Sequence, residues 1–127
     1  MNRERRLAFF CVCVALLALA GCSLLSSHSI PTPDPPSALA IGLVGEVMRF
    51  EVALLSCARG HEALIQWDWG EGGELSDWST SFGLTHSWSS PGRYEVRVRV
   101  RCAVDDSVVS SWSDAFQVDI LEMPTPG

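Results

Sequence analysis

The chain has 127 residues, enough for one domain of ordinary size and little more. Its basic residues are all arginines, and fifteen carboxylates against nine arginines give a net charge of −6. So acidic a chain argues against nucleic acid and anionic lipid headgroups as direct ligands.

Residues 1–21 have the features of a secretory signal peptide, because an arginine-rich start precedes a short apolar run. That run has about fifteen residues, fewer than the roughly 20 that span a bilayer. It ends in Leu19-Ala20-Gly21-Cys22, which resembles the lipobox of bacterial lipoproteins, where the cysteine after the cleavage point receives lipid. We expect Cys22 to anchor the protein on a membrane surface. The alternative is a membrane-spanning helix that stays in place.

Cleavage before Cys22 would leave six arginines and fourteen carboxylates, a net charge of −8. Ser23, the next residue, resembles the signal that sends lipoproteins to an outer membrane. We therefore expect the protein in the cell membrane or outer membrane, exposed to the periplasm or the exterior.

The segment 22–38 is predicted to be a linker, because it is rich in serine and has four prolines between residues 31 and 36. Such a composition favours an extended polyproline-II spacer. Residues 122–127 are again proline-rich and are predicted to be a flexible tail. These limits leave residues 39–121 as the folded domain.

Alternation of apolar and polar residues predicts strands through most of the domain. The clearest case is residues 93–102, where apolar side chains share one parity and four arginines share the other. Similar alternation covers residues 47–54, 64–69 and 116–120, with turn signals at 70–73, 91–92 and 105–107. We find no convincing helix in the mature chain, so the pattern favours a small all-β sandwich of antiparallel strands.

Three motifs in order resemble the PKD (polycystic kidney disease) domain, in the variant found in bacterial and archaeal surface proteins. They are the stretch from Gln66 to Gly72, then His86-Ser87-Trp88, then Pro91-Gly92-Arg93-Tyr94-Glu95-Val96. The resemblance implies an immunoglobulin-like β-sandwich outside the cell that acts as a spacer or binds protein or polysaccharide. Its motif residues here are Trp67, Asp68, Gly70, Gly72, His86, Pro91, Gly92 and Tyr94.

The motif residues have clear structural tasks. Pro91-Gly92 favours a tight turn, Trp67 is expected at the centre of the core, and His86 is expected to hydrogen-bond nearby backbone. Trp69 and Trp88 are expected to cover the edges of that core.

The chain departs from the family pattern in three places. Glu71 replaces the usual aspartate of the first motif, and Trp88 replaces the usual tyrosine of the second. Cys57 and Cys102 stand where related sequences often carry aspartates.

Cys57 and Cys102 are the two cysteines left once the signal peptide and the lipidated residue are set aside. An even pair in an oxidising compartment favours a disulfide, which would close a loop of about 46 residues and stabilise the fold by roughly 4 kcal/mol. The alternative is two buried free thiols. Strict alternation from Phe50 places Cys57 on the outward parity, so the bridge requires a break in strand phase at Ser56.

No residue pattern indicates catalysis, because the histidines at positions 28, 61 and 86 fit no triad and no metal-binding spacing. No cofactor is expected. The carboxylates Asp68, Glu71, Glu74 and Asp77 are weak candidates for calcium, and solvated side chains are the simpler interpretation.

Trp78 and Trp112 are the candidate ligand-binding residues, because an exposed indole stacks on sugar rings. Alternatively, each folds over its neighbouring strand as a plug. The arginines of residues 93–101 are expected to form cross-strand ion pairs. A docking surface for an acidic partner is the second interpretation of that row.

The sequence thus predicts a lipid-anchored, non-enzymatic surface protein that binds polysaccharide or an envelope protein. The alternative is a structural spacer, or an accessory subunit of an envelope assembly with no soluble ligand.

Overall fold

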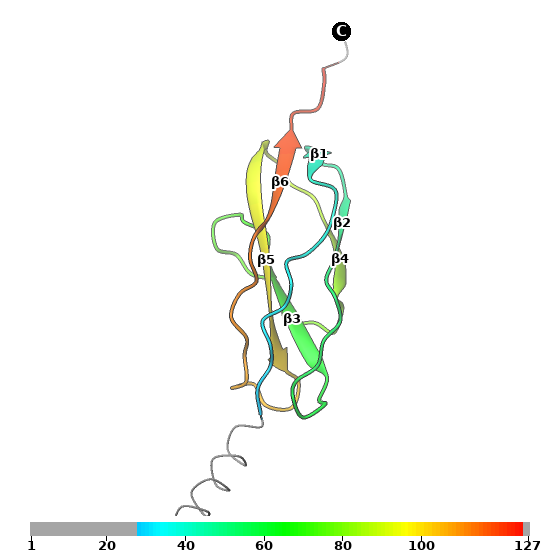
Figure 1. The fold of residues 1–127 in the computed structure, drawn as a ribbon. Coiled ribbons are helices and arrows are strands. Elements are labelled where there is room, and N and C mark those ends of the chain that lie inside the picture. Colours follow the sequence, from blue (N-terminus) through cyan, green and yellow to red (C-terminus); the bar gives the residue numbers. More distant parts are fainter. Residues whose placement is uncertain (1–27, 126–127) are drawn as a thin grey trace, which may run out of the picture.

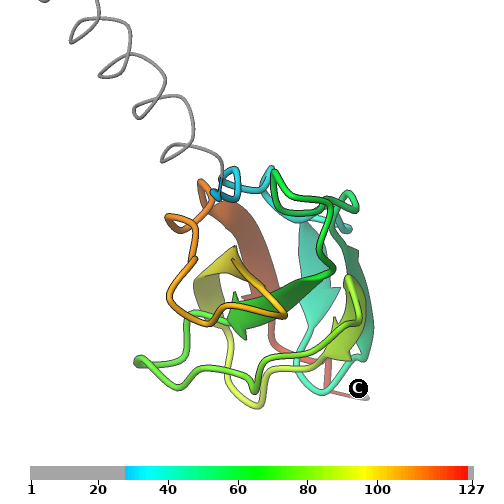
Figure 2. The same cartoon turned by 90° about the horizontal axis from the view of Figure 1, so that it is seen from below.

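The structure, a computed structural model, describes residues 28–125, so Cys22 and the predicted signal peptide lie outside the described residues. Within this range the strands, in chain order, are β1 (Ile41–Leu43), β2 (Met48–Glu51), β3 (Ala63–Asp68), β4 (Gly83–His86), β5 (Gly92–Cys102) and β6 (Phe116–Leu121). One sheet has the order β1-β6-β5-β3, and β2 pairs with β4 in the other (Figure 1). Figure 2 shows the two layers nearly end-on. The predicted all-β, immunoglobulin-like sandwich is confirmed, and its strand pairs are antiparallel as predicted except that β1 runs parallel to β6.

β5 is the long strand that the alternation of residues 93–102 predicts. Its inward side chains are fully buried, namely Val96, Val98, Val100 and Cys102. Its arginines take the opposite parity and lie on the outer face of the sheet. β5 pairs antiparallel with β3 and with β6, so it is the strand around which this sheet is built.

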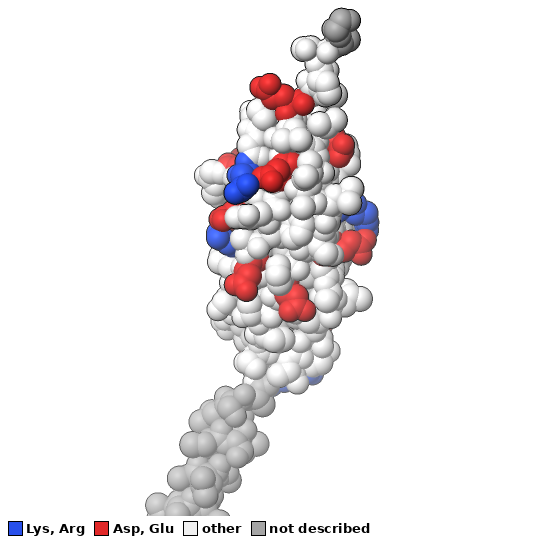
Figure 3. All heavy atoms as spheres, turned by 45° about the horizontal axis from the view of Figure 1, so that its top comes forward, with Lys and Arg blue, Asp and Glu red and all other residues white. Residues whose placement is uncertain are grey.

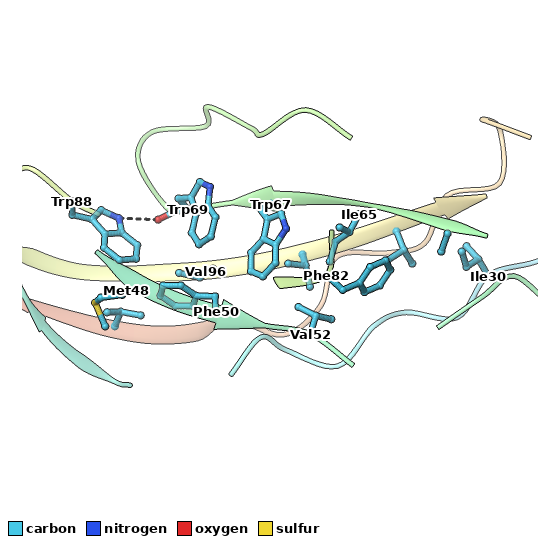
Figure 4. Close-up of a cluster of buried hydrophobic side chains, with 14 of the residues drawn as sticks. Ile30, Met48, Phe50, Val52, Ile65, Trp67, Trp69, Phe82, Trp88 and Val96 are labelled. Carbon is cyan, nitrogen blue, oxygen red and sulfur yellow. Dashed lines mark hydrogen bonds between the residues drawn. The ribbon is translucent and has the colours of Figure 1, made fainter. Parts of the chain in front are cut away.

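The core between the sheets is aromatic (Figure 4). Trp67 and Trp88 are both 0 % exposed, so Trp67 is central as expected, whereas the expectation that Trp88 only covers an edge of the core is wrong. The rings of Trp67 and Trp69 are stacked with centroids 4.8 Å apart, and the His86 imidazole lies parallel to Trp69 at 4.3 Å. The indole Nε1 of Trp88 donates a hydrogen bond of 3.3 Å to the Trp69 carbonyl. Burial of this much aromatic surface supplies much of the driving force for folding.

His86 differs from its predicted role. Its Nε2 lies 3.0 Å from the carboxylate of Glu71, so its polar partner is a side chain and not the neighbouring backbone. The turn that follows Trp69 brings Glu71 back over β4, which is why an acidic residue fifteen positions earlier reaches the imidazole.

The alternation predicted through Leu54 is wrong at its end. β2 stops at Glu51, Val52 is still buried, and Leu54 is 83 % exposed. The chain then turns, and Cys57 returns to the interior. The required break in phase therefore exists, but it falls before Ser56.

The described part of the predicted linker, residues 28–38, lies against the sandwich. Ile30, Pro33 and Pro36 are buried. Ser37 and Glu51 exchange two backbone hydrogen bonds of 2.8 and 3.0 Å, which satisfies part of the edge of β2. The described chain thus begins at one end of the sandwich, and its C-terminus lies at the other (Figure 1). No helix within residues 28–125 is long and apolar enough to cross a membrane.

Candidate functional site

Two serine-rich segments flank the β3–β5 pair and place both candidate tryptophans. The hydroxyl of Ser76 accepts a hydrogen bond of 2.8 Å from the Trp67 N–H of β3. On the other side, Ser110 accepts one of 3.0 Å from Val100 of β5. Each hydroxyl also donates to the carbonyl of the next residue, at 3.0 and 2.8 Å. At both edges a serine hydroxyl therefore takes the place of the backbone carbonyl that a regular strand would offer. Each of these serines positions a tryptophan two residues further on.

Trp78 and Trp112 meet across Arg99 on the outer face of this sheet. The guanidinium carbon of Arg99 lies 5.3 Å from the Trp78 ring centroid and 4.6 Å from that of Trp112. Arg101 adds a second contact to Trp78, at 5.2 Å. Both indoles are half-buried. We call Trp78, Arg99 and Trp112 the Trp/Arg platform. Its rings are held in place by cation–π contacts, and each retains an exposed part.

Gln66 of β3 orients the centre of the platform. Its side-chain oxygen accepts a hydrogen bond of 2.9 Å from Nε of Arg99, the residue opposite it in the β3–β5 register. The Gln66 amide nitrogen donates to the Ser76 carbonyl at 3.0 Å. The guanidinium is therefore fixed by one hydrogen bond and two rings.

The predicted ladder of cross-strand ion pairs holds for one arginine. Arg93 pairs with Asp119 of β6 at 2.9 Å, and that hydrogen bond and charge raise the pKa of Arg93. Arg97 pairs at 3.1 Å with Glu95, which precedes it on the same strand. Figure 3 shows how carboxylates are interspersed with the few guanidinium groups of the face in view.

Of the four carboxylates proposed as weak calcium candidates, Asp68 and Glu71 make hydrogen bonds within the protein. Asp68 accepts the N–H of Gly70 at 2.9 Å, and Glu71 pairs with His86. Among the described residues, the potential ligand atoms that converge belong to a different set, of two histidines and two cysteines.

Cys57 and Cys102 are both buried, at 3 % and 0 % exposure, and both are free thiols in this structure. Their sulfur atoms lie within 4.8 Å of each other. The sandwich therefore brings the two cysteines together, and the disulfide itself stays a prediction. Burial raises the pKa of the Cys57 thiol, but backbone N–H groups of Arg59 and His61, the Cys102 side chain and the Arg59 charge outweigh it and lower that pKa.

His61 and His28 complete this group, although neither fits a metal-binding spacing in the sequence. The Nδ1 atom of His61 lies 3.3 Å from Sγ of Cys102. The two imidazoles meet edge to face with centroids 5.3 Å apart. The local spacing Cys57-x-x-x-His61 was the one available signal, because His28 comes from the predicted linker and Cys102 from the far end of β5.

Residues 42–111, more than half of the chain, match the family model of the PKD domain. The chain belongs to the PKD domain family. PKD domains are typically extracellular or surface domains, and they generally act as binding or spacer modules and not as catalysts. A search of the curated proteins found no match.

Two solved structures share the fold of this PKD domain. One is the PKD domain of an M14-like peptidase from Thermoplasmatales archaeon SCGC AB-540-F20, at 18 % identity and a TM-score of 0.60, covering 75 % of this chain and 98 % of that one. The other was solved to explain the promiscuous specificity of carbohydrate-binding modules from the β-sandwich superfamily. It has 19 % identity and a TM-score of 0.55, and the match covers 72 % of this chain and 35 % of that one.

Proposed function

We propose that this PKD-domain protein is held at the cell envelope by lipid on Cys22 and binds polysaccharide, without catalysis, through the Trp/Arg platform. The observation that carries the proposal is the meeting of Trp78 and Trp112 across Arg99 on one sheet face. Two tryptophans that are 34 positions apart in sequence, each set by a serine, form one surface there.

The platform suits a sugar chain for two reasons. The indoles are held by Arg99 before any ligand arrives, so little side-chain freedom is lost on binding. An indole offers a flat apolar surface for the C–H face of a sugar ring, and the guanidinium groups of Arg99 and Arg101 offer N–H donors for its hydroxyls. The fold shared with carbohydrate-binding modules is consistent with this use of a sandwich face.

Attachment through Cys22 would place the domain next to the membrane. Stable anchoring by acyl chains needs two or more lipid signals, which a lipoprotein-type modification supplies. Mass spectrometry of the protein extracted from membranes tests this part: the expected result is an N-terminal acylated Cys22, and an unprocessed Met1 terminus would contradict it.

A pull-down on insoluble envelope and plant polysaccharides tests the binding role. The full chain in detergent is compared with Trp78→Ala, Trp112→Ala and the control Arg49→Ala, whose exposed side chain lies on β2 in the other sheet. We expect retention by at least one polymer, lost in either tryptophan variant and kept in the control. Circular dichroism of each variant confirms that the fold is intact.

A spacer or accessory subunit is the second candidate, and one observation favours it. Arg99 already stacks on both indoles, so the rings are also explained as a cover over the β3–β5 pair. In that case no polymer retains the folded protein, and the tryptophan variants lose stability without losing any binding. That result would refute the polysaccharide role.

A further inference from the structure

Four potential metal ligands converge at the end of the sandwich where the described chain begins. We call His28, Cys57, His61 and Cys102 the Cys/His cluster. One ligand atom from each lies within 4.8 Å of the other three. Among the described residues, His28 contacts the partly exposed carboxylate of Asp105 at 3.6 Å, and none of the four belongs to the Trp/Arg platform. The cluster therefore calls for its own explanation.

Two sulfurs and two imidazole nitrogens are the ligand set of a tetrahedral zinc site. Zinc–sulfur bonds of about 2.3 Å and zinc–nitrogen bonds of about 2.0 Å place neighbouring ligands roughly 3.3–3.8 Å apart. The His61 Nδ1–Cys102 Sγ distance of 3.3 Å already has this length, and the largest separation, 4.8 Å, requires small side-chain shifts. We propose that the Cys/His cluster binds one Zn²⁺ ion.

Independent backbone contacts hold the ligands in place. Cys57 and His61 lie on one tight turn, closed by hydrogen bonds from Cys57 N to the His61 carbonyl and from Gly60 N to the Cys57 carbonyl. Cys102 is the last residue of β5. His28 is fixed because the next residue, Ser29, accepts a hydrogen bond of 2.8 Å from Ala58 N of the same turn.

The state of His28 is a second observation that points to a ligand. Its Nε2 is buried and has no hydrogen-bond partner, whereas its Nδ1 lies 3.6 Å from the carboxylate of Asp105. Asp105 is itself held by the N–H and hydroxyl of Ser107, at 3.0 and 2.6 Å. Zinc-binding histidines usually donate a hydrogen bond from their second nitrogen to a carboxylate, and a small shift would bring Asp105 into that role and leave Nε2 of His28 to coordinate the metal.

Charge and burial also agree with the proposal. Binding displaces the protons of the two thiols, so two thiolates, two neutral imidazoles and Zn²⁺ form a neutral site. Such a site suits cysteines that are almost completely buried. His28 precedes the rest of the domain and lies six positions after Cys22, the proposed lipid anchor. Bound zinc would therefore also hold the segment next to that anchor against the sandwich.

Cobalt binding tests the site, because Co²⁺ replaces Zn²⁺ and reports thiolate ligands by charge-transfer absorption. The full chain, with Cys11, Cys13 and Cys22 changed to serine, is titrated in reducing buffer, and Zn²⁺ is then added in competition. We expect one Co²⁺ per chain, a thiolate–cobalt band, and displacement by one Zn²⁺. The variant His28→Ala is expected to weaken binding strongly while keeping the thiolate band.

The matched pair Asp105→Asn and Asp106→Asn tests the geometry without removing a ligand. We expect Asp105→Asn to weaken metal binding about 10- to 100-fold, as removal of a carboxylate that orients a zinc-binding histidine does. Asp106→Asn is expected to leave the affinity unchanged. Equal affinities would overturn the role of Asp105. Absence of a thiolate–cobalt band in the folded, reduced protein would overturn the site. The site would also be overturned if protein whose thiols are blocked at lysis contains the Cys57–Cys102 disulfide in every molecule, because that bond uses both sulfur ligands.

Discussion

The turn after Trp69 allows a prediction with its own internal control. Gly70 and Gly72 both have left-handed backbone, with φ of 78° and 84°. A Cβ atom at Gly70 would lie 2.8 Å from the carbonyl oxygen and 3.0 Å from the nitrogen of Glu95 in β5, whereas one at Gly72 would have nothing within 4 Å. The two positions therefore share a backbone conformation and differ in how closely another strand approaches.

The expected costs follow from that difference. The left-handed conformation costs a non-glycine residue about 1–2 kcal/mol, and this applies to Gly70→Ala and Gly72→Ala alike. Contact with the Glu95 backbone, which cannot move without shifting β5, adds about 1–3 kcal/mol at Gly70 alone. For a domain of this size each kcal/mol lowers the Tm by roughly 4–8 °C.

Urea unfolding of both variants measures the two costs as free energies of unfolding. We expect Gly70→Ala to be less stable than Gly72→Ala by about 1–3 kcal/mol. The slope of its unfolding free energy against urea concentration is expected to equal that of the unchanged protein. Equal losses in the two variants would refute the reasoning, because they would mean that the close approach of β5 does not restrict residue 70.

Three further predictions use the same unfolding measurements. Ser76→Ala should cost about 1–2 kcal/mol because the Trp67 N–H loses its acceptor, whereas Ser111→Ala, at an exposed position, should stay within about 0.5 kcal/mol. Ile30→Ala should cost about 2 kcal/mol if the segment before residue 38 belongs to the fold, and exposed Leu54→Ala should cost less than about 0.5 kcal/mol; equal effects would contradict the packing described. Zn²⁺ at about 1,000 times its Kd should stabilise the reduced protein by about 4 kcal/mol, an increase in Tm that a chelator reverses; an unchanged Tm would contradict binding to the folded state.

The sequence by itself determined the sandwich, because the signals that specify it are local. Alternation in residues 93–102 fixes which face of β5 is buried, since side chains of a strand point to opposite faces in turn. The motifs around Trp67, His86 and Pro91-Gly92 identified the family for the same reason: each is a short stretch whose turn or core residue can be recognised without its neighbours in space.

The tertiary structure decided everything that depends on register and on chain reversal. Leu54 could not be placed from the alternation, because the strand ends where the turn toward Cys57 begins. Trp78 and Trp112 were proposed separately, but only pairing of the flanking segments with β3 and β5 sets Arg99 between them.

The Cys/His cluster is the clearest example of that limit. Its members come from the predicted linker, one loop and the end of the longest strand, so no window of sequence contains them. Periodicity reports which side of its own strand a residue faces, whereas convergence of four side chains depends on how separate segments pack together.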